Sequence, residues 1–276
     1  TPGGLRSVSQ RSLRWYLMRV NGYELAPKVD LSGADLRKTN LREASLSGAI
    51  LIRADLTEAD LRGADLTAAQ LAGANLDRAD LRGARLPEAN LDRVDLHKAT
   101  LCGADLAGAN FHMAEMNGAD LSGANLIAAD LERAYLKGVT AVATDLSEAV
   151  LSRAFLGGAN LRGVNLTRGH LAGSDLIGAN LFGANLTAAN LHLADLHDAI
   201  LSEADLDSAN LHGSNLTRAI LRGANLHKAN LYRVDLAGAD LTGVRVYGAD
   251  FTEASADAAT VWDPDFDPTF AGVTSH

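Results

Sequence analysis

Residues 51–70 read LIRADLTEADLRGADLTAAQ, which is four copies of one five-residue unit. Each unit has a leucine at its centre, a small residue two positions earlier, and usually Asp or Asn between them. From position 31 to position 261 a centre falls on every fifth residue, and 40 of these 47 centres are leucine. The remaining centres are Phe111, Met116, Ala141, Val246, Phe251, Ala256 and Val261. A period this constant predicts a repeat architecture.

A five-residue period fits neither a regular helix nor a straight strand. On an α-helix, a step of five residues turns through roughly 140°, so the leucines would spread over every face. On a strand, an odd step would place successive leucines on opposite faces. If the backbone turns once per unit, the small residue and the leucine point inward and the other three residues point outward. We therefore predict an all-β solenoid whose stacked coils are joined by parallel hydrogen-bonded ladders.

The unit, as in Ala34-Asp35-Leu36-Arg37-Lys38, resembles the repeat of the pentapeptide-repeat family over about 85% of the chain. The resemblance implies a right-handed quadrilateral parallel β-helix with four five-residue sides. A coil would then take 20 residues, and about 12 coils would form a rod of roughly 55–60 Å. The spacing by itself leaves the number of sides open.

The two ends of the chain depart from the repeat. We expect a tail and capping helix over residues 1–25, the β-helix over 26–262, and a C-terminal cap or tail over 263–276. The helix would run from Ser9 to about Asn21, with Gly22 as its stop, and would either cover the first coil or bind a partner. At the other end, Trp262, Phe266 and Phe270 would cap the last coil or form a two-fold dimer contact. The quinolone-resistance members of the family, whose C-terminal end forms their dimer, favour the second alternative by resemblance.

No sequence motif points to catalysis, a cofactor or a membrane. The chain lacks nucleophile-elbow, phosphate-loop and zinc-protease patterns, and its carboxylates are spread along the outside of the coil. His192 and His212 would lie one coil apart and could share a metal, but two ligands favour a stacking ladder instead. The single Cys102 excludes an intramolecular disulfide, and no apolar run reaches 18 residues. We predict a non-enzyme without metal or cofactor.

Charge distinguishes the sides of the predicted rod. The net charge of −9 disfavours direct binding of nucleic acid or of an anionic membrane. One predicted row of outward positions is largely acidic and is our candidate partner-binding surface. Its charged members are Asp35, Asp55, Asp95, Glu115, Asp175, Asp195 and Asp235. Another row carries Arg42, Arg62, Arg82, Arg162 and Arg222. These residues would form either an anion-binding ladder or, with Asp60 and Asp80, a mixed solvated face.

The acidic row is interrupted by Tyr135 and Phe155, which should stack on adjacent coils. An exposed aromatic pair in a polar field is a candidate contact for a partner, although the two rings could instead cover an irregular coil at residues 139–144.

This chain resembles family members that protect DNA gyrase by imitating duplex DNA, and this resemblance implies the most specific function. Duplex DNA carries a charge every 1.7 Å or so, hence roughly 32 charges over 55 Å, whereas the chain has a net charge of −9. Mimicry could only be local. We expect a cytoplasmic, bacterial interaction protein, with gyrase as the specific partner hypothesis and an assembly scaffold unrelated to DNA as the alternative.

Overall fold

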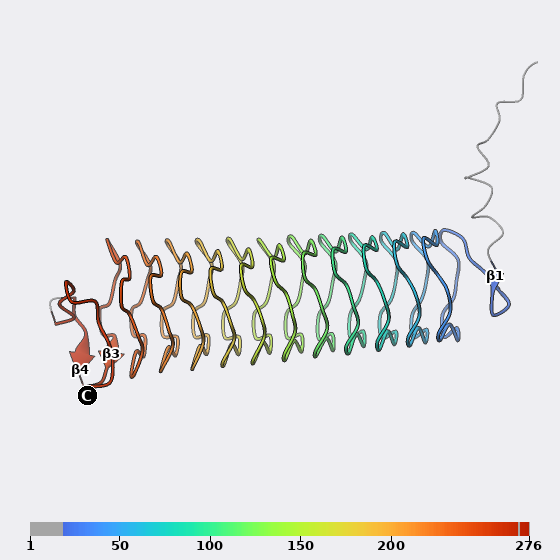
Figure 1. Cartoon of the computed structure of the whole chain (residues 1–276). Helices are drawn as coiled ribbons and strands as arrows, with labels where there is room; N and C mark the ends of the chain where they lie inside the picture. The colour runs from blue at the N-terminus through green and yellow to red at the C-terminus, as the bar shows by residue number, and fades with distance from the viewer. Residues whose placement is uncertain (1–18, 270, 276) are drawn as a thin grey trace, which may run out of the picture.

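The computed structural model describes residues 19–269 and 271–275, which form a rod of stacked coils (Figure 1). From Asp30 to Asp235, each residue that precedes a centre pairs in parallel with the residue 20 positions later, as in Asp35 with Asp55 and Asn40 with Asp60. One coil therefore takes 20 residues and has four sides. This confirms the quadrilateral β-helix that the resemblance implied.

Two kinds of backbone hydrogen bond hold the coil. Along the rod, the centre residue donates to the next coil, as Leu36 N does to Asp55 O at 2.8 Å. Around the rod, the small residue closes a turn by donating three residues back, as Ala44 N does to Leu41 O at 3.1 Å. The third residue of that turn has a positive φ, which glycine adopts at little cost. Lys38 holds the same position at φ 55°, so glycine is not obligatory there.

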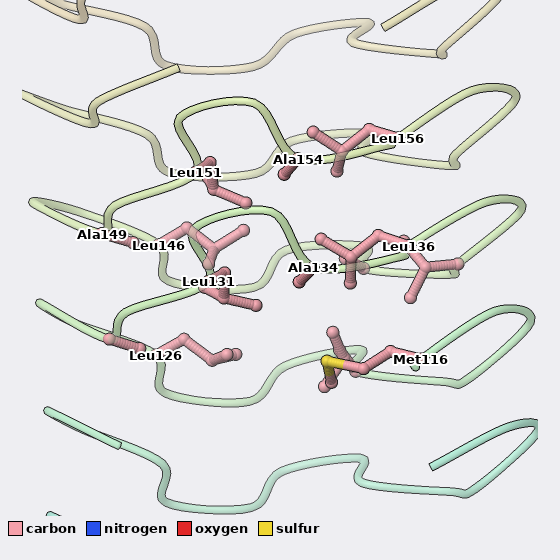
Figure 2. Packing of buried hydrophobic residues seen from close by; sticks show 14 of the residues in the cluster. Met116, Leu126, Leu131, Ala134, Leu136, Leu146, Ala149, Leu151, Ala154 and Leu156 are labelled. Carbon is pink, nitrogen blue, oxygen red and sulfur yellow. The ribbon is translucent and has the colours of Figure 1, made fainter. Parts of the chain in front are cut away.

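The centres and the small residues fill the inside of the rod. Figure 2 shows Met116, Leu136 and Leu156 above one another on successive coils, and all three are buried. Full burial of a leucine side chain contributes about 1.5–3 kcal/mol, and nearly every unit supplies one. The pattern persists at residues 139–144, where Ala141 is a buried centre and the hydroxyl of Thr144 donates to Leu121 O at 2.8 Å.

A β-hairpin, and not the end of a helix, precedes the first coil. Strand β1 (Arg19–Val20) pairs antiparallel with β2 (Tyr23–Glu24). The expected helix is therefore wrong for residues 19–21, and its residues 9–18 lie outside the described part of the chain. The physical reason is the turn sequence: Asn21 and Gly22 both have positive φ, which an Asn-Gly hairpin turn requires. Val20 and Tyr23 pack against the core.

The register shifts by one residue in the last coil. Asp240 pairs with Val261, 21 positions later, so Val261 occupies an outward rung and is 49% exposed. The expectation that Val261 is a buried centre is wrong, and Trp262 takes that place against the core. The ring of Phe251 lies 6.2 Å from the ring of Trp262 and 5.3 Å from the ring of Phe266.

After these aromatic residues the chain returns to the rod, where β3 (Ser255–Ala256) pairs in parallel with β4 (Thr274–Ser275). The predicted aromatic Phe270 lies outside the described residues. Apart from these four short strands, the described backbone consists of isolated rungs and turns, and it contains no helix.

Candidate partner-binding side

The predicted acidic row is one continuous ladder. Its rungs pair in sequence along a single side of the rod, which we call the acidic side together with the residues two and three positions after each rung. The ladder joins Asp35, Asp55, Asn75, Asp95, Glu115, Tyr135, Phe155, Asp175, Asp195, Asn215, Asp235 and Ser255. The structure thus brings together all seven acidic candidates and places the aromatic pair among them.

Most carboxylates of the row have a structural role that the sequence analysis missed. One oxygen of each accepts the backbone N–H two residues later, as in Asp95 with His97 at 2.9 Å and Asp195 with His197 at 3.1 Å. This is the geometry of an Asx turn, which an asparagine forms equally well. Asn215 does so with the N–H of Thr217 at 3.0 Å. The turn therefore explains why Asp and Asn alternate at this position of the repeat. This alternation was the sequence signal from which the turn could have been predicted.

The N-terminal end of the row is partly neutralised by one arginine. Arg37 forms a salt bridge to Asp35 at 2.7 Å and approaches Asp55 at 3.6 Å. The hydrogen bond from Arg37 is the main cause that lowers the pKa of Asp35 to about 2. Within the described residues, no member of the row from Asp95 to Asp235 forms a salt bridge, so that stretch presents uncompensated negative charge.

The aromatic pair forms a stack on the surface of the acidic side. The ring centroids of Tyr135 and Phe155 are 5.0 Å apart and their planes differ by 9°. The two residues remain 38% and 43% exposed. The adjoining coil at 139–144 keeps its usual ladder, because Ala141 N donates to Asn160 O at 2.8 Å and Ala143 N donates to Arg162 O at 3.0 Å. The turn bond that would join Thr144 N to Ala141 O, and that the neighbouring units form, is absent from this part of the described chain, so both interpretations of the ring pair remain.

A groove runs beside the two rings, and the sequence analysis missed it. Its volume is about 520 Å³. It is lined by Asn117, Tyr135, Lys137, Phe155, Gly157, Gly158, Asp175 and Ile177. The groove exists because two consecutive glycines leave its floor without side chains. Gly157 does not have a positive φ, so its backbone would accept a side chain, and a Cβ there would lie 3.8 Å from the Asp175 carboxylate. The Gly-Gly pair was the available sequence signal.

The other candidate features are local structure. The rings of His192 and His212 lie 4.8 Å apart and those of His212 and Tyr232 lie 5.1 Å apart, as a ladder predicts, but both contacts are edge to face and not stacked. No group of three or more His, Cys, Asp or Glu side chains in the described ranges is arranged to hold a metal ion.

The arginine row forms a mixed ionic face. Asp80 pairs with Arg82 at 2.6 Å and with Arg62 at 3.4 Å, so these cations are partly compensated. Hydrogen bonds from these arginines hold the pKa of Asp60 and Asp80 below its usual range. Next in this row, burial raises the pKa of the Cys102 thiol to about 11.

Comparison with protein families matches the description "Pentapeptide repeats" over overlapping segments between residues 30 and 255. The chain belongs to the pentapeptide-repeat family, and its β-helix is right-handed. No curated protein sequence matched significantly. In the part of the chain that the structure describes, no helix is long and apolar enough to cross a membrane.

Several solved structures are similar to this chain. HetL from the cyanobacterium Nostoc sp. strain PCC 7120, a protein involved in heterocyst differentiation regulation, is 37% identical over 71% of this chain and 88% of its own, with a TM-score of 0.48. Rfr23 from the cyanobacterium Cyanothece 51142 is 41% identical over 37% of this chain and 66% of its own, with a TM-score of 0.31. QnrB1, a plasmid-mediated fluoroquinolone resistance protein, is 17% identical over 75% of this chain and 89% of its own, with a TM-score of 0.35.

Proposed function

We propose that the protein is a non-catalytic interaction rod whose partner docks on the acidic side. The observation that carries this proposal is the exposed stack of Tyr135 and Phe155 beside a groove, in a row that is otherwise polar. Aromatic residues with a neighbouring pocket are the usual energetic centres of protein interfaces. The core of the coil is filled by side chains, and Asp95 and Asp195 on this side are partly exposed residues that accept turn hydrogen bonds.

The most specific version of the proposal is a cytoplasmic protein that binds DNA gyrase in place of DNA and protects it from gyrase poisons. Its support is the stretch of the row from Asp95 to Asp235, where carboxylates without ion pairs follow the rod axis. Adjacent coils are about 4.8 Å apart. Phosphates of one DNA strand are spaced by about 3.4 Å along the helix axis, so Asp175 and Asp195 approach the charge density of a single strand.

Gyrase supercoiling tests this version directly. Purified protein should inhibit supercoiling of relaxed plasmid by gyrase, and at lower concentration should reduce quinolone-stabilised cleavage. Neutralising Asp175 and Asp195 should weaken both effects. Supercoiling and cleavage that do not change at any protein concentration would remove gyrase as the partner.

The second candidate is an assembly scaffold whose partner has no relation to DNA, and the aromatic stack favours it. Replacing Tyr135 and Phe155 by alanine should then abolish partner capture, while neutralising the acidic row should have a smaller effect.

The end of the rod offers a further contact, because Trp262 is only partly buried there. A homodimer through this end predicts a doubled mass in light scattering that Trp262→Ala reduces to the monomer.

A further inference from the structure

We infer that the groove beside Tyr135 and Phe155 binds an extended segment of a basic protein, apolar in the middle and carrying Lys or Arg on both sides. The inference rests on the proposed function and names the chemistry of its partner. The middle of the site is apolar, because Phe155 and Ile177 are 43% and 42% exposed beside a glycine floor. Both ends are anionic: Glu115 follows Asp95 on one flank, and Asp195 follows Asp175 on the other.

The coil spacing sets the length of the segment. Neighbouring coils are about 4.8 Å apart, so Glu115 and Asp175, three coils from each other, are separated by about 14 Å. Asp95 and Asp195 are five coils from each other, or about 24 Å. An extended chain advances about 3.3 Å per residue, so these distances correspond to roughly four and seven residues. Two basic residues on each side of about four less polar residues would match all four carboxylates.

An extended chain suits this surface better than a helix does. The groove lies between the ring stack and Gly158 at the corner, within one five-residue side of the coil. An α-helix with its side chains is about 10–12 Å across, whereas neighbouring extended strands lie only about 4.8 Å apart. An extended chain therefore needs less width on this side of the coil than a helix does.

Charge excludes the two other obvious occupants. A second copy docked through the same side would oppose its own carboxylates to those of Glu115 and Asp175, and like charges in direct contact are unfavourable. A nucleic acid would meet the same repulsion. The row does not neutralise itself, because from Asp95 onward it forms no salt bridge in the described residues. A cationic partner is attracted by the carboxylates on both flanks, which would repel these two occupants.

Lys137 provides the sharpest discrimination. It is the single cation lining the groove, it is exposed, and it forms no ion pair among the described residues. Asn117 accepts a hydrogen bond from the backbone N–H of Lys137 at 3.0 Å, and this bond does not involve the Lys137 side chain. For a basic partner, Lys137 opposes binding, so Lys137→Glu should tighten the complex. For an acidic partner, the same change should loosen it.

The test uses a fluorescein-labelled peptide, Arg-Arg-Gly-Leu-Leu-Gly-Arg-Arg, whose anisotropy is measured against the full protein. We expect saturable binding that weakens with salt. It should be at least about tenfold weaker after Tyr135→Ala with Phe155→Ala, and several-fold tighter after Lys137→Glu. The matched control variant is Phe182→Ala, because Phe182 is equally exposed, at 38%, but lies on another side. It should bind the peptide as the unaltered protein does.

Three outcomes would overturn the inference: absence of binding, equal binding of a peptide with all four arginines at one end, or weaker binding by Lys137→Glu. These outcomes are separate from the gyrase version of the function. A protein that binds the peptide but leaves supercoiling unchanged keeps the inference and loses gyrase. A protein that inhibits gyrase without binding the peptide supports gyrase as the partner and contradicts the inference about the groove.

Discussion

Replacing the free carboxylates of the acidic side by asparagine should remove their charge without weakening the fold. The four positions are Asp95, Asp175, Asp195 and Asp235. Each accepts a backbone N–H two residues later, at 2.9 to 3.1 Å. Asparagine keeps that acceptor, and Asn75 already serves in this way in the same ladder, with the N–H of Asp77 at 2.9 Å. The net charge would change from −9 to −5, because four negative charges are removed.

The matched control is the corresponding fourfold alanine variant, which has the same net charge but lacks the acceptors. A typical intramolecular hydrogen bond contributes about 0.5–1.5 kcal/mol, so the alanine variant should lose about 2–6 kcal/mol if the four effects add. The effects of Asp175 and Asp195 need not add, since neighbours on adjacent coils can couple in either direction. Both variants remove the repulsion between those two carboxylates, so the difference in stability between the variants reports the lost acceptors.

Urea unfolding followed by circular dichroism measures the difference between the two variants. We expect the asparagine variant to unfold at the midpoint of the unaltered protein and the alanine variant to unfold earlier. Both variants should lose partner binding on the acidic side to the same extent. Equal stability of the two variants would refute the structural role assigned to the turns, and unchanged binding by the asparagine variant would refute the role assigned to the charge.

Three further predictions concern the core, the ionic face and the thiol. Leu71→Ala empties a fully buried centre and should cost about 3–5 kcal/mol, read from the urea midpoint. Because Arg82 lowers the pKa of Asp80, this pair stabilises the fold above pH 4 or so and loses that contribution as the pH falls further. The stability gap to Arg82→Met should therefore narrow steadily as the pH falls below 4 or so. Finally, iodoacetamide at pH 8 should alkylate Cys102 about 100-fold more slowly in the folded than in the unfolded protein, because burial raises its pKa to about 11.

The periodic part of the fold was predictable because one short-range rule governs it. Most units independently specify an inward leucine and an outward Asx turn, so the register could be followed from Leu31 to Ala256 without knowledge of the tertiary structure. The number of sides was different. It depends on how far each corner turns, and it was supplied by family resemblance before the 20-residue pairing confirmed it.

The ends were mispredicted because non-periodic signals compete there. At the N-terminal end, Gly22 was interpreted as the stop of a helix, although the dipeptide Asn21-Gly22 is a strong hairpin signal. At the C-terminal end, the side chain of Thr260 donates to Leu236 O at 2.9 Å, within a segment that takes one extra residue. A fading repeat does not reveal such a bulge, so Val261 was assigned to the core and Trp262 was not.

The candidate site was predictable in its members but not in its shape. The acidic row and the ring pair follow from counting in steps of 20, and the ladder joins them in that order. The groove depends on what is missing at Gly157 and Gly158, and the partial neutralisation depends on the rotamer with which Arg37 reaches two coils. Neither property has a periodic signature.

The constant 20-residue pairing also restricts how the length of this protein can change. Removing 20 residues deletes one whole coil and shortens the rod by about 4.8 Å, while every downstream residue stays on its own side. Removing five residues shifts all downstream units by a quarter turn, so the carboxylates after the cut would continue around the corner. Insertions and deletions that preserve a straight binding surface must therefore come in whole coils.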